Sequence, residues 1–249
     1  MKIDKIKILE VAVLAGKILL ENGADMTRVE DTMLRIGRNA GLENVVAFVT
    51  PTGIFISLRG EAYSQMESIQ QTTMNLEKVA YVNQLSRKFG EGTITISAFY
   101  QLLQQIDEDI KDFNFWLKTL AASLVSASLM YIFGGEFRDF FATFVVGGMG
   151  YMLYYFLNKR TEVDFLNNGL VAFVIALLAG LFVKLHLGTD MNMIIIGSVM
   201  PLVPGVKITN AFLDGISGHT ISSMTSGLQA LLTAGSIGVG VAIALKLLL

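Results

Sequence analysis

Apolar and polar residues are distributed unevenly along the 249-residue chain. Charged side chains are frequent over residues 1–112, whereas from Phe113 onward they are sparse and long apolar runs dominate. A helix that crosses a membrane needs about 20 consecutive, largely apolar residues. The pattern therefore predicts a soluble domain over residues 1–112 and a transmembrane helical domain over residues 113–249.

The first part of the chain carries helical patterns at both of its ends. The spacing of apolar residues and the positions of glycines predict helices over 2–22, 27–40, 69–88 and 94–109. At the start of the second helix, Thr27 and Glu30 form a capping-box pattern, in which each side chain would satisfy a free amide of the new helix.

Two β-branched and aromatic segments, 44–49 and 54–58, lie between the second and third helices. The turn Thr50-Pro51-Thr52-Gly53 separates them, with proline second and glycine fourth as in a type I turn. This pattern predicts a β-hairpin. Because two strands alone are marginally stable, helices must cover one face. We therefore expect a cytosolic α+β domain in which a β-hairpin-based sheet packs against helices.

The second part contains about five candidate membrane spans, at 116–133, 140–157, 170–187, 191–205 and 228–249. This predicts an all-α transmembrane bundle. With the N-terminus in the cytoplasm, Lys159, Arg160 and Lys207 all lie on the cytoplasmic side, as the positive-inside rule prefers. We therefore expect a multi-pass protein of the cell (inner) membrane with a cytoplasmic N-terminal domain.

The fourth span is broken between Met200 and Pro204. Pro201 and Pro204 are two of only three prolines in the chain, and Gly205 follows them directly. Proline removes a hydrogen bond from a helix, and hydrocarbon tolerates the freed polar groups only where protein or trapped water satisfies them. A broken apolar segment of this kind points to a transport site. The alternative is a helix that ends at Pro201 at the membrane face, followed by an ordinary loop.

Polar residues follow this break. Asp214 is the strongest candidate for chemistry, because carboxylates at bilayer depth are costly and usually functional; the alternative places it at the cytoplasmic surface. Asn210 shares its helix face and follows Thr209, so these residues can hold a small polar substrate or a proton. Lys207 can counter a carboxylate substrate, or it marks the cytoplasmic edge.

Further candidates lie at structural corners of the first domain. As motif or gating positions we consider Arg28, Glu30, Thr50, Pro51, Thr52 and Gly53. Capping and turn formation are an adequate alternative explanation for Glu30, Pro51 and Gly53. His219 can relay protons near neutral pH, or it is simply a loop histidine.

Composition narrows the function classes. The chain is 53% hydrophobic with a net charge of -2, so global electrostatics favours no nucleic-acid partner. It has no cysteine and two histidines, which excludes disulfides and thiolate chemistry, and we expect no metal and no cofactor. A phosphate-loop motif is missing, so any pumping is secondary. Ser217 and His219 lack the spacing of a hydrolase nucleophile elbow, and we expect no enzyme.

Three segments together resemble the N-terminal half of the threonine/serine exporter family, namely 23–30, 50–53, and 200–205 with Thr209, Asn210 and Asp214. The resemblance covers nearly the whole chain. It implies a cytosolic domain and about five spans that work with a C-terminal half, which some members carry as a separate protein. It also implies efflux of small polar metabolites, threonine and serine in some members and C4 dicarboxylates such as succinate in split pairs. His219 departs from the family pattern, in which many members have an acidic residue.

The favoured hypothesis is a subunit of a secondary-active exporter of these metabolites, driven by the proton-motive force. Its expected partners are a second hydrophobic half-exporter subunit, a small-molecule substrate and membrane lipid. Small residues repeat every fourth position over 172–180 and 230–242, which indicates a sliding or gating interface or, alternatively, plain packing within the bundle. Together with the odd number of spans, these faces indicate a bundle that is incomplete alone, and we expect an oligomer. The alternative is a membrane-anchored sensor or scaffold whose cytosolic domain binds a ligand or partner. A third hypothesis is an intramembrane hydrolase that uses Ser217.

Overall fold

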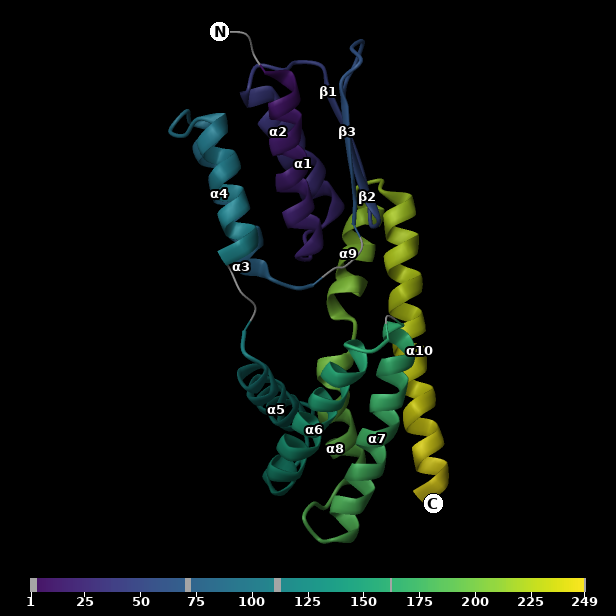
Figure 1. Ribbon diagram of the computed structural model, residues 1–249. Helices are drawn as coiled ribbons and strands as arrows, with labels where there is room; N and C mark the ends of the chain where they lie inside the picture. The colour runs from purple at the N-terminus through teal and green to yellow at the C-terminus, as the bar shows by residue number, and fades with distance from the viewer. Residues whose placement is uncertain (1–3, 70–72, 110–112, 162, 249) are drawn as a thin grey trace. The chain divides into compact units, whose positions relative to one another are not determined.

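The computed structural model describes residues 4–69, 73–109, 113–161 and 163–248, and Figure 1 shows its helices and strands. Contacts divide the chain into two compact units. The first is Met1–Asp112 with Ile208–Gly227, and the second is Phe113–Lys207 with Leu228–Leu249. This division places residues 208–227 with the N-terminal part. That residues 1–112 form a soluble domain and residues 113–249 a membrane domain stays a prediction.

Four helices come from the N-terminal part of the first unit: α1 (Lys5–Glu21), α2 (Met26–Asn39), α3 (Leu76–Gly90) and α4 (Ile96–Asp109). The N-cap residues of α1, α2 and α3 are Asp4, Asp25 and Asn75. The side chain of each accepts a hydrogen bond from a backbone amide in the first turn of its helix. The capping box predicted for Thr27 is therefore wrong. Thr27 is exposed, and Asp25 is the N-cap of α2.

The sheet of the first unit is antiparallel with strand order β1-β2-β3. β1 (Val45–Thr50) and β2 (Gly53–Leu58) form the predicted hairpin, whose loop is residues 51 and 52. β3 (Ser64–Ser68) adds a third strand, and its mostly polar sequence carries little strand signal. The helix predicted from residue 69 begins at Leu76; residues 70–72 lie outside the described residues.

α1 organises the core of the first unit. Val11 and Ile18 of α1 are fully buried, and they share one apolar cluster with Met33 of α2 and Ile54 of β2. Gly16 allows α1 to approach α2, because a Cβ at this position would lie 2.6 Å from the Met33 sulfur. One face of the sheet is thus covered by helices, as the marginal stability of a small sheet requires.

The second unit is helical. It begins with α5 (Phe115–Ile132), the short 3-10 helix η1 (Phe137–Asp139), α6 (Phe140–Asn158), α7 (Asp164–Lys184), α8 (Met191–Val199) and the 3-10 helix η2 (Met200–Leu202). The remaining helices, α9 (Gly205–Ile216) and α10 (Thr220–Leu248), each contribute residues to both units.

Among the described residues, four helical segments are long and apolar enough to cross a membrane: Phe115–Ile132, Phe137–Asn158, Asp164–Lys184 and Thr220–Leu248. A fifth candidate is the pair Met191–Leu202 and Gly205–Ile216, which is bent by 57°. Pro201 lies within η2, and Val203 adopts an extended backbone before Pro204. The proline ring crowds the backbone of the residue before it, and a helix therefore commonly ends before a proline. The structure agrees with the predicted bundle of about five helices, one of them broken between Met200 and Pro204.

Glycines set the distance between helices of the second unit. A Cβ on Gly240 of α10 would lie 2.2 Å from the carbonyl oxygen of Gly169 in α7. A Cβ on Gly197 of α8 would lie 2.7 Å from the carbonyl oxygen of Ser126 in α5. Such close backbone approach is typical of membrane helix pairs, which gain contact energy from small residues. Gly238 of α10, in contrast, has open space around its Cβ position.

We predict that Gly240→Ala lowers the free energy of unfolding of the second unit by about 1–3 kcal/mol, because the added methyl group overpacks the contact between α7 and α10. Gly238→Ala is the matched control, and its effect should stay within about 0.5 kcal/mol. Denaturation of the full chain in mixed detergent micelles, followed by circular dichroism, measures both. Equal effects of the two substitutions would show that α7 and α10 do not meet at Gly169.

Candidate functional site

The predicted site residues fall into two groups. Thr209, Asn210 and Asp214 belong to the first unit, together with Arg28, Glu30 and the turn Thr50–Gly53. Lys207 belongs to the second unit, as do Pro201, Pro204 and Gly205. Residues that looked like one polar run in the sequence are therefore divided between the two compact parts.

Asp214 is the central group of the first unit's site. Its side chain is completely buried. One carboxylate oxygen accepts a hydrogen bond from the backbone N–H of Met26 (3.1 Å), and the other accepts one from the hydroxyl of Ser222 (2.6 Å). Met26 is the first residue of α2, whose initial amides have no partner within the helix. The carboxylate satisfies one of these amides and lies at the positive end of the helix dipole.

Asn210 contacts the same region one helical turn earlier. Its side-chain amide donates to the carbonyl of Gly23 at 3.5 Å, a long and weak hydrogen bond. Asn210 and Asp214 thus share a face of α9, as predicted from their spacing. Both form hydrogen bonds with residues 23–26, at the start of α2. Thr209 is exposed.

The turn between α9 and α10 brings His219 to α2. The imidazole Nε2 lies 3.6 Å from a carboxylate oxygen of Glu30, and both side chains are partly exposed. Glu30 therefore does not cap α2; it faces the histidine. Arg28 pairs with Asp25 through its Nε atom at 3.2 Å and is half exposed.

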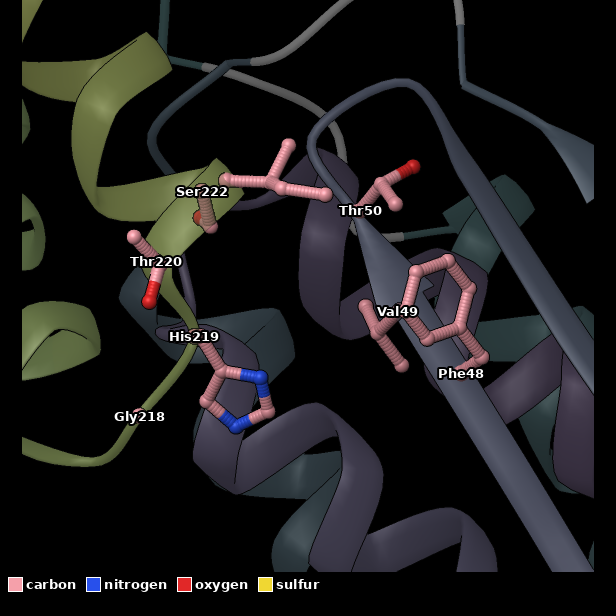
Figure 2. Close-up of a pocket in the computed structure, with 8 residues that line it drawn as sticks. Phe48, Val49, Thr50, Gly218, His219, Thr220 and Ser222 are labelled. Carbon is pink, nitrogen blue, oxygen red and sulfur yellow. The ribbon is translucent and has the colours of Figure 1, made fainter.

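A pocket of about 290 Å³ lies beside these groups in the first unit. Its lining comes from the end of β1, from the turn before α10 and from the first residues of α10: Phe48, Val49, Thr50, Gly218, His219, Thr220, Ile221 and Ser222. Figure 2 shows the ring of His219 extending from the turn toward the strand that carries Phe48 and Val49. Ser222 connects the pocket with the buried carboxylate, because it lines the pocket and its hydroxyl donates a hydrogen bond to Asp214.

The turn of the hairpin contributes one residue to this pocket. Thr50 lines it, while its hydroxyl donates to the carbonyl of Gly53 at 3.0 Å and so closes the two-residue loop. Thr52 is exposed, and Pro51 is the other residue of that loop. The structure thus brings Thr50, His219 and the Asp214 partner Ser222 together, although they are far apart in the sequence.

Lys207, in the second unit, forms an ion pair with Asp164 at the start of α7, with 3.4 Å between its Nζ atom and a carboxylate oxygen. Both side chains are partly exposed, so the pair contributes little to stability. Asn167, nearby on α7, is buried and bonds to Asn158 and Thr161. The start of α9 therefore lies beside a polar cluster formed where α6 meets α7.

Asp139 is a buried carboxylate that the sequence analysis did not single out. It is completely buried in the second unit, where it accepts hydrogen bonds from the hydroxyl of Thr189 (2.9 Å) and the backbone N–H of Asp190 (3.2 Å). These contacts join the end of η1 to the N-cap of α8. An aspartate directly before an apolar run is a recognisable helix-start signal, but the sequence does not show which distant loop it would bind.

Among the described residues, no group of three or more histidine, cysteine or acidic side chains could hold a metal ion. What the first unit's site offers instead is a buried carboxylate, the hydroxyl residues Thr50, Thr220 and Ser222, and an imidazole close to a second carboxylate. Such groups can donate hydrogen bonds to a polar solute and accept them from it.

Comparison with known proteins identifies the class. A family model described as "Putative threonine/serine exporter" (ThrE) matches residues 10–248. The "Probable succinate transporter subunit YjjP" of Klebsiella aerogenes is 25% identical, over 92% of this chain and 89% of its own length. The "Probable threonine/serine exporter" of Mycobacterium tuberculosis and the "Threonine/serine exporter" of Corynebacterium glutamicum are 20% and 19% identical, each over 96% of this chain. The aligned region covers 46% and 51% of those two proteins. No solved structure matches the chain significantly.

The apolar helices and these matches define a multi-pass membrane transporter. The chain belongs to the threonine/serine exporter family, whose members are transporters and not enzymes.

We predict that Asp25→Ala lowers the free energy of unfolding by about 1 kcal/mol, because it removes the N-cap of α2. Thr27→Ala is the matched control and should change it by less than about 0.5 kcal/mol, since Thr27 is an exposed residue inside the helix. Thermal unfolding of the full chain in detergent measures both. If Thr27→Ala were the more costly change, the capping box would be restored as the correct assignment.

Proposed function

We propose that this chain is one subunit of a secondary-active exporter of small polar metabolites, driven by the proton-motive force. Its substrates are threonine/serine-type amino acids or C4 dicarboxylates such as succinate, and its partner is a second hydrophobic half-exporter subunit. In this proposal the N-terminal domain is cytoplasmic and the apolar helices cross the cell membrane. Family membership supports transport, and the relatives named as subunits support a multi-subunit assembly.

The observation that carries the proposal is the buried carboxylate of Asp214, which follows a proline-broken apolar helix. Its two hydrogen-bond donors are neutral, a backbone amide and a hydroxyl. Burying a carboxylate is costly, and in a membrane transporter such a group usually marks the path of the solute or the ion. We therefore assign the coupled proton to Asp214.

We assign the neighbouring polar residues to the solute. Asn210 offers an amide that is held only by a long hydrogen bond, and Thr209 precedes it on α9. Lys207 pairs with a carboxylate of the substrate. To do so it releases Asp164, with which it forms a weak, partly exposed ion pair. The broken segment at Pro201, Pro204 and Gly205 serves as the hinge at which the pathway opens.

A second candidate function rests on the pocket of the first unit. A pocket of about 290 Å³ with hydroxyl, imidazole and aromatic lining is large enough for a small metabolite. This observation favours the alternative of a membrane-anchored sensor or scaffold whose cytosolic domain binds a ligand or partner. In that case Thr50, Glu30 and Arg28 would report ligand binding, and Asp214 would hold α2 in place.

Asp214→Asn tests the exporter directly. We expect proton-driven uptake of labelled threonine or succinate into inside-out vesicles to fall by about 100-fold, because a proton-transfer group has been removed. The vesicles carry the full chain with its partner subunit, and both substrates are tested with and without a protonophore. Thr225→Val, which changes another hydroxyl of α10 that bonds only to Ile221 of its own helix, is the control. Uptake at the wild-type level by Asp214→Asn would remove Asp214 from the mechanism.

A second pair of variants separates the two candidate functions. The exporter predicts that Asn210→Ala slows uptake in the same vesicles by about tenfold, through loss of a substrate contact. It also predicts that Thr52→Ala in the exposed hairpin loop retains uptake near the wild-type rate. The sensor or scaffold predicts the opposite order, because the hairpin would belong to its recognition surface. Uptake rates for the two variants, normalised to the amount of each in the membrane, decide between them.

A further inference from the structure

The outer face of the sheet carries an unusual row of side chains. The strand register places Phe48 of β1 opposite Phe55 of β2, and Phe55 opposite Met66 of β3. All three are exposed, with 57%, 43% and 64% of their surface accessible. The two phenylalanine rings lie 6.3 Å apart. Three large apolar side chains therefore form a continuous exposed row across all three strands.

The rest of this face carries no charge. Because side chains alternate between the two faces of a strand, the other positions on the outer face follow from the register as Val46, Thr50, Gly53, Ser57, Ser64 and Ser68. None of the nine residues is acidic or basic. The opposite face holds Val49, Ile54 and Ile56, which are buried in the core of the first unit.

When one face of an antiparallel sheet is in water, the side chains on that face are normally polar. Charged side chains are also a common means of preventing association of sheets. Here the expected charges are missing, and an apolar row with a rim of small hydroxyl residues takes their place. A contiguous exposed apolar patch rimmed by polar residues marks an interaction site.

We propose that this face, defined by the row Phe48, Phe55 and Met66, binds the same face of a second copy of this chain. An isologous contact requires a surface that is complementary to itself. An uncharged apolar face meets its own copy without repulsion between like charges, whereas a surface selected for an anionic membrane would carry lysine or arginine. Two flat sheet faces also pack together about 10 Å apart, with their side chains interdigitated.

The contact would border the pocket of the first unit. Phe48 and Thr50 belong to the outer face and also line the pocket. A second copy seated on the row would therefore lie along one wall of the pocket. The inference concerns assembly, so it stands or falls separately from the proposed transport function.

The absence of cysteine makes a clean test possible, because a single introduced thiol is the only reactive one. Ser57→Cys places it on the central strand of the face, and Gln84→Cys places a control thiol on the exposed surface of α3. Each full-length variant is expressed as two differently tagged copies in native membranes and treated with a bis-maleimide that spans about 10 Å, the spacing of packed sheets. We expect Ser57→Cys to give a product of twice the chain mass that carries both tags, about tenfold more than Gln84→Cys.

A third variant shows whether the apolar row is responsible. Adding Phe55→Ser and Met66→Ser to Ser57→Cys should reduce the doubly tagged product about tenfold, because exposed apolar anchors near the centre of an interface carry most of its energy. Circular dichroism and the elution volume in detergent check that the protein remains folded. Equal products from Ser57→Cys and Gln84→Cys would overturn the proposal. A product of another mass at Ser57→Cys would also overturn it and assign the face to a different protein.

Discussion

The first unit depends on one buried carboxylate. Asp214 brings a carboxylate into a completely buried site, where the Met26 amide and the Ser222 hydroxyl donate hydrogen bonds to it. Burial of a carboxylate is costly unless it is hydrogen-bonded, so this contact tolerates little displacement. It holds the α9–α10 corner against the beginning of α2. The pocket, His219 and the approach to Glu30 all follow from that placement.

The same physical device occurs a second time, in the second unit. Asp139 is equally buried and is held by Thr189 and Asp190 at the start of α8. In each case a carboxylate accepts a hydrogen bond from a backbone amide at, or just before, the first residue of a distant helix. These contacts are directional, whereas apolar packing is not. Two buried carboxylates thus fix the register of elements that hydrophobic contact alone would leave free to slide.

Membership of the exporter family and the geometry of the chain answer different questions. The family match covers residues 10–248 and establishes a transporter, while the named relatives differ in substrate. The geometry adds a buried, hydrogen-bonded carboxylate, a broken apolar helix and a pocket lined by residues from β1 and α10. The outer face of the sheet adds the proposed contact between copies, which is argued independently of the family and of the pocket.

The sequence by itself determined the local features. Apolar runs, the positions of glycine and proline and the turn at residues 50–53 predict most helices, the hairpin and the break at Pro201–Pro204, because these features depend on neighbouring residues. The local prediction failed at the start of α2, where Asp25 and not Thr27 is the N-cap. Only the tertiary structure decided which distant groups meet. The polar strand β3 extends the hairpin, and Asp214 binds Met26, 188 positions away in the sequence. Such pairings arise from packing between segments, and residue spacing along the chain contains no record of them.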